Sequence, residues 1–152
     1  MQTGKYSFHL LGIYHGLEVM YTCTARADNF VTEEDFDGLI QLIDAHKTKR
    51  WLWIMDFQEM SYAKMMSLSF ISRLVTYLKT EHTNSLTHIW IVNMNYWIYT
   101  ILSYFVTAKV RMISEERRQI DMAEAMTELG FPVNQQTKLL TFLSANRTFG
   151  TE

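Results

Sequence analysis

The chain has 152 residues, of which 48% are hydrophobic and 14% aromatic, a composition that excludes an intrinsically disordered protein and suffices for one hydrophobic core. The formal net charge of −2 excludes the broad basic surface that nucleic-acid binding usually requires. A single cysteine excludes an intramolecular disulfide, and the first residues do not resemble a signal peptide, so we expect a soluble, cytoplasmic protein.

The first element predicted along the chain is a β-hairpin. Two segments rich in strand-forming residues, 5–14 and 17–25, are joined by a two-residue turn. Gly16, at the second position of that turn, permits a positive φ angle. On the second strand we interpret Cys23 as a small buried apolar residue rather than as a nucleophile.

A helix, a central strand and a second helix are predicted next. Thr32 can cap a helix whose apolar stripe predicts an end near Lys47. Residues 51–55 are an uninterrupted apolar run and predict the central strand of a sheet, closed by Asp56. Helical spacing of apolar residues over 62–80 predicts a long helix with an ordinary charged outer side.

The most informative feature is the run 83–108, which comprises 26 residues without one Asp, Glu, Lys or Arg. Its length alone would permit a membrane-spanning helix. However, Asn-Met-Asn at 93–95 is typical of a turn, because Asx side chains hydrogen-bond to nearby backbone groups. We therefore divide the run into a buried strand at 88–92, a turn and a helix at 96–106, and expect no transmembrane segment.

This helix has two different stripes. The predicted buried stripe is apolar and consists of Ile98, Ile101, Leu102 and Phe105. The opposite stripe is uncharged and consists of Tyr96, Thr100, Ser103 and Thr107. Because a solvated helix usually carries Lys or Glu, the second stripe is expected to face another protomer, a membrane surface or a bound apolar molecule. The alternative is that the chain's own C-terminal segment covers it.

The remaining elements complete an α/β pattern. Residues 109–113 predict a short edge strand, and a helix is expected from Ser114 to Gly130. Its predicted inner residues are Ile120, Met122, Ala123, Met126 and Leu129. A C-terminal helical tail is expected at 133–147. Helices that alternate with strands after a hairpin predict a mixed, mostly parallel sheet with flanking helices.

Catalytic and metal-binding motifs are weak. The six glycines form no phosphate-binding loop, and the five histidines form no helical metal-ligand pair. Asp56 lies at the carboxyl end of the predicted central strand, where open α/β sheets tend to place ligands, although Asp after a strand is also a common turn residue. Asp56 and His88 are the only suggestions of an active site, so we expect no enzyme, metal or cofactor.

Four segments resemble the CRAL-TRIO family: Trp-Ile-Met-Asp at 53–56, Ser-Leu-Thr-His-Ile-Trp-Ile-Val-Asn-Met at 85–94, Tyr-Trp-Ile-Tyr-Thr-Ile-Leu-Ser-Tyr-Phe at 96–105, and Ala-Lys-Val-Arg-Met at 108–112. The resemblance is clearest over 50–113 and implies one domain over 1–152. It also implies that the domain holds a lipid or another hydrophobic molecule over the sheet, with the helix at 96–106 as a movable gate. Met-Asn replaces the family's Ala-Pro after the strand, and some divergent members of the family are protein-interaction modules.

The element order is also similar to that of STAS domains, which share this superfold and act as regulatory interaction modules. Their switch is a phosphorylatable serine that follows an Asp at the start of the second helix. In this chain Ser61 and Ser67 are the candidate regulatory serines, but neither follows an Asp.

Together these observations predict a non-catalytic binding module that holds a lipid-like ligand or a protein partner, a second copy of the chain included, beside the helix at 96–106. The alternative is a STAS-like regulatory interaction domain. The candidate contact residues are Asp56, Asn93, Tyr96, Trp97, Thr100, Ser103, Tyr104 and Thr107.

Overall fold

A computed structural model describes the parts of the chain that form its regular elements. These are residues 8–14, 16–23, 33–57, 68–92, 96–105, 108–113 and 117–149; the side chains of 33–35, 68–71, 96–98, 105 and 144–149 are not described. The strands are β1 (His9–Tyr14), β2 (Leu17–Cys23), β3 (Arg50–Asp56), β4 (Leu86–Val92) and β5 (Lys109–Ile113). The helices are α1 (Glu33–Asp44), α2 (Leu68–Glu81), α3 (Tyr96–Phe105), α4 (Arg118–Glu128) and α5 (Val133–Phe149).

The described strands form one mixed sheet in the order β1-β2-β3-β4-β5. Strand β1 pairs antiparallel with β2, and every later pairing is parallel. Gly16 has a φ of 76° in the turn between β1 and β2, a value that glycine adopts without steric cost. The predicted fold class, the hairpin and the edge position of β5 are therefore confirmed.

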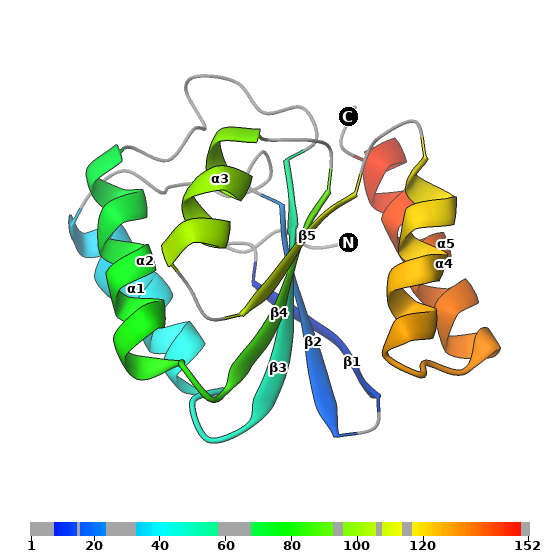
Figure 1. The fold of residues 1–152 in the computed structure, drawn as a ribbon, viewed down its shortest axis with the longest axis horizontal. Coiled ribbons are helices and arrows are strands. Elements are labelled where there is room, and N and C mark those ends of the chain that lie inside the picture. Colours follow the sequence, from blue (N-terminus) through cyan, green and yellow to red (C-terminus); the bar gives the residue numbers. More distant parts are fainter. Residues whose placement is uncertain are drawn as a thin grey trace.

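Helices cover both faces of the sheet (Figure 1). Helices α1, α2 and α3 lie on one face, and α4 and α5 lie on the other. The alternating side chains of β3 show the same division: Trp51 and Trp53 belong to the core beneath α1–α3, whereas Leu52 and Ile54 belong to the core beneath α4 and α5. In the described structure the C-terminal helices are thus separated from α3 by the sheet, and the alternative that they cover its outer stripe is wrong.

Some predicted boundaries and one helix phase are wrong. Helix α1 ends at Asp44, before the predicted Lys47, and the predicted residues 62–67 of the second helix lie outside the described part. In α4 the buried stripe is Met122, Ala125 and Met126, so Ile120, predicted to lie inside, is 55% exposed. Gly130, with a φ of 76°, follows α4 as predicted.

None of the described helices is long and apolar enough to cross a bilayer. The charge-free run instead supplies strand β4, whose Ile89 and Ile91 are fully buried, and then helix α3.

Candidate functional site

Helix α3 presents the uncharged outer face that the sequence predicts. Leu102 is 2% exposed and packs in the core beneath α1–α3, with Ile101 partly buried against it. On the other side Thr100 and Ser103 are exposed, and Tyr104 is 82% exposed. We call Thr100, Ser103 and Tyr104 the α3 outer face. It is polar and aromatic without charge, a composition suited to contact with a surface that carries no strong charge.

Several predicted contact residues lie outside the described part. Asn93, Thr107 and the candidate regulatory serines Ser61 and Ser67 are not described. Tyr96 and Trp97 belong to the first turn of α3, but their side chains are not described.

Asp56 is buried rather than exposed to a ligand. It is the last residue of β3 and is 1% exposed. One carboxylate oxygen accepts a hydrogen bond of 2.7 Å from the hydroxyl of Tyr21, whose own ring packs edge-on against Phe142 of α5. Asp56 thus joins the core beneath α4 and α5, on the opposite face from α3, and the structure does not bring it together with the α3 outer face.

Asp56 and His88 do not form a joint site either. In the parallel pairing of β3 with β4, Asp56 aligns with Val92, whereas His88 aligns with Leu52. Four residues of extended strand therefore separate the two side chains along the sheet, a distance of about 13 Å. This geometry argues against an active site built on both residues.

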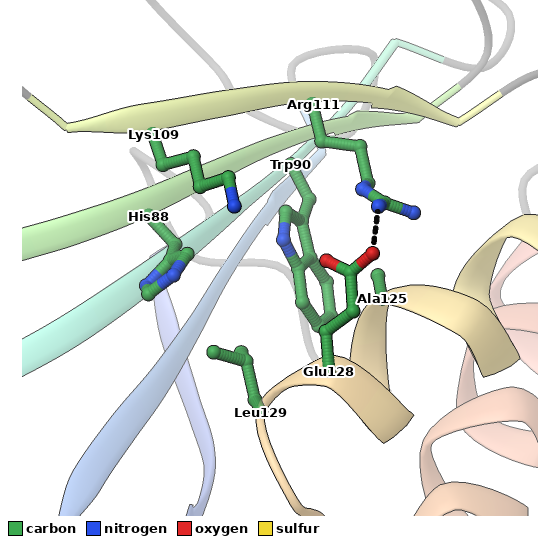
Figure 2. Close-up of a pocket in the computed structure, with 7 residues that line it drawn as sticks. All are labelled: His88, Trp90, Lys109, Arg111, Ala125, Glu128 and Leu129. Carbon is green, nitrogen blue, oxygen red and sulfur yellow. Dashed lines mark hydrogen bonds and ion pairs between the residues drawn. The ribbon is translucent and has the colours of Figure 1, made fainter.

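A small pocket lies around His88, between the edge of the sheet and α4 (Figure 2). It has a volume of about 80 Å³. Its lining consists of His88 and Trp90 from β4, Lys109 and Arg111 from β5, and Ala125, Glu128 and Leu129 at the end of α4. Of these residues the sequence suggests only His88, because the charged residues come together through strand register and through the packing of α4 on the sheet, which no local spacing reveals.

The pocket contains two cationic side chains, Lys109 and Arg111, and one carboxylate, Glu128. Arg111 donates to Glu128 at 2.8 Å, and this ion pair is partly exposed. Burial lowers the pKa of His88, and the charges of Lys109 and Arg50 lower it further, whereas Glu128 raises it. His88 is therefore held mainly in its neutral form at neutral pH.

A second histidine, His82, is buried just after α2 on the other face. Its Nδ1 accepts a 3.3 Å hydrogen bond from the indole of Trp51 and lies 2.8 Å from the hydroxyl of Ser85, while Nε2 lies 3.2 Å from the hydroxyl of Tyr77. Because an indole N–H only donates, Nδ1 must carry its lone pair. This network joins α2 to β3, and its contacts support a structural role.

No group of three or more His, Cys, Asp or Glu side chains that could hold a metal ion occurs among the described residues. No protein-family model matches the chain, and a search of curated proteins gives no significant match.

Proposed function

We propose that the chain is a non-catalytic protein-interaction module that contacts its partner through the α3 outer face. The observation that carries the proposal is the exposure of the uncharged α3 outer face, on which Tyr104, near the end of the helix, is 82% exposed. Tyrosine is enriched in protein interfaces because its ring supplies apolar area and its hydroxyl supplies a hydrogen bond.

A protein partner fits the geometry better than a lipid. The inner side of α3 already packs into the core through Leu102, and the outer side is the convex surface of a helix. The small pocket near His88 lies on the opposite face, and its 80 Å³ is well below the roughly 300–1,000 Å³ of sites that enclose drug-sized ligands.

The resemblances in the sequence favour the same region. In the CRAL-TRIO family the helix that corresponds to α3 is the movable gate, and divergent members and STAS domains alike serve as interaction modules. The element order observed here, a hairpin followed by alternating helices and strands, agrees with the order that the STAS resemblance implies.

Native mass spectrometry of the purified protein tests the choice between the two classes of partner. A protein complex, either a dimer or a complex with a second protein, that is lost in Ser103→Lys supports the proposal. A co-purifying mass of lipid size, lost on denaturation, would contradict it in favour of a hydrophobic ligand. Ser72→Lys, at an exposed position of α2, is the matched control and should retain the complex.

A further inference from the structure

The pocket near His88 brings three hydrogen-bond donors, on Trp90, Lys109 and Arg111, together with one histidine to one small space (Figure 2). In the β4–β5 register His88 aligns with Lys109 and Trp90 aligns with Arg111. Side chains two residues apart on a strand point to the same face, so these two aligned pairs project together toward α4. A protein with a net charge of −2 thus concentrates two permanent cations and a histidine in one pocket.

The indole N–H of Trp90 is a further donor in the pocket. In two other tryptophans the corresponding N–H is already hydrogen-bonded within the protein. The indole nitrogens of Trp51 and Trp53 donate to His82 and Thr22. Trp90 is 2% exposed, and its indole nitrogen lies on the side of the ring toward His88 and Lys109. Within the described part of the chain this nitrogen has no protein acceptor, and it is not closed off from solvent. A ligand oxygen in the pocket would therefore replace water as its acceptor.

The local hydrogen bonds also fix which nitrogen of His88 can reach a ligand. The hydroxyl of Thr87 donates its single hydrogen to the carbonyl of Trp51 at 3.2 Å. His88 Nδ1, 2.8 Å from that hydroxyl oxygen, is therefore the donor to it, which leaves Nε2 with the lone pair. Protonation of Nε2 would make it a further donor to an anion.

We propose that this pocket binds the phosphate group of a small molecule. Its donors come from two strands and an indole ring rather than from one planar fork, which suits a tetrahedral group with several oxygens. A volume of about 80 Å³ admits one such group, and the rest of the molecule would extend through the open mouth of the pocket. Among the described residues Lys109 forms no ion pair and is exposed, so its ammonium group is available.

The charged groups around the pocket set its response to pH and to mutation. Lys109, Arg111 and Arg50 favour an anion, and Glu128, which shares Arg111, competes with it. Because a bound phosphate favours the protonated form of His88, binding should raise the pKa of this histidine and be accompanied by uptake of a proton there. Glu128→Gln should tighten binding about fivefold, and Lys109→Gln should weaken it about fivefold, as expected for solvent-accessible charges.

The indole N–H signals in a ¹H–¹⁵N NMR spectrum give a direct test, because the chain has only four tryptophans and Trp90→Phe identifies the relevant signal. Titration with inorganic phosphate should move the Trp90 signal saturably and leave those of Trp51 and Trp53 in place. Sodium chloride at equal ionic strength should have no comparable effect. Lys79 is an exposed lysine of α2, so Lys79→Gln is the matched control for Lys109→Gln. It should bind phosphate as tightly as the unmodified chain does.

Three results would overturn the phosphate site. They are the absence of a saturable Trp90 shift, an equal affinity in Lys109→Gln, and binding of acetate as tight as that of phosphate.

Discussion

Helices α2 and α3 lie side by side on the same face of the sheet but differ on their outer sides (Figure 1). Helix α2 carries Arg73, which lies over the ring of Phe36, and ends with Glu81, which pairs with Lys47 at 2.7 Å. Helix α3 has no charged residue at all. Both helices bury an inner leucine, Leu78 in α2 and Leu102 in α3, so packing against the core does not by itself explain the difference, which points to a role for the outer side of α3.

The largest expected effect concerns the inner side of α3. Leu102→Lys would bury a charge without a partner and should lower the free energy of unfolding by about 3–5 kcal/mol. Ile101→Lys should cost less, because Ile101 is only partly buried and its ammonium group can reach water. Urea unfolding measures both values. An unchanged midpoint for Leu102→Lys would show that α3 is not packed as described.

A gentler change compares the two helices at matched positions. Leu78 of α2 and Leu102 of α3 are both 2% exposed. Truncation of either one to alanine should cost about 2–5 kcal/mol, from lost burial and the cavity that remains. Parallel denaturant unfolding of the two variants tests whether the inner sides are equivalent. A cost below about 1 kcal/mol for Leu102→Ala alone would indicate that α3 is only loosely attached.

A lower pH should destabilise the end of α2 more than α3, because the buried histidine His82 directly follows α2. Burial lowers the pKa of His82 below 6.5; the Asp44 charge opposes the shift and Lys47 adds to it. The unfolded chain therefore takes up this proton first as the pH falls, so stability should be flat above about pH 6.5 and decline below it, by at most about 1.4 kcal/mol per pH unit for one proton.

Hydrogen exchange at pH 7 and pH 5.5 locates this effect. Protection at the end of α2, near His82, should decrease more than protection in α3. The control is His82→Gln, in which the additional loss at the end of α2 should disappear. Equal losses in both helices would contradict the assignment to His82.

The smallest effects on stability are expected at the outer positions. Ser103→Lys on α3 and Ser72→Lys on α2 replace exposed side chains, so each should change the free energy of unfolding by less than about 0.5 kcal/mol. Thermal unfolding measures both. A large loss in Ser103→Lys would mean that this position is covered within the folded chain.

Much of the fold could be predicted because it rests on local periodicity. Alternating or continuous apolar runs identified β3 and β4, and the 3.6-residue spacing identified the two sides of α3. Periodicity failed for Ile120, since its hydrophobicity alone placed it inside α4, whereas the buried stripe of that helix runs through Met122, Ala125 and Met126.

The candidate sites were harder to predict because they depend on how distant elements meet. The pairing of Arg111 with Glu128 joins residues 17 positions apart, and the alignment of His88 with Lys109 follows from the parallel register of β4 and β5. Likewise, the sequence did not show that α4 and α5 pack on the face opposite to α3, and that arrangement decides whether the α3 outer face is exposed.

Site-specific photocrosslinking tests the central claim most directly. With p-benzoylphenylalanine in place of Tyr104, irradiation of cells that express the chain should yield a covalent adduct with a protein of defined mass, and Ser103→Lys should abolish it. The same photoreactive residue in place of Ser72 should give no such adduct. An absence of adduct from position 104, or an equal yield from position 72, would contradict the proposal that the α3 outer face is the contact surface.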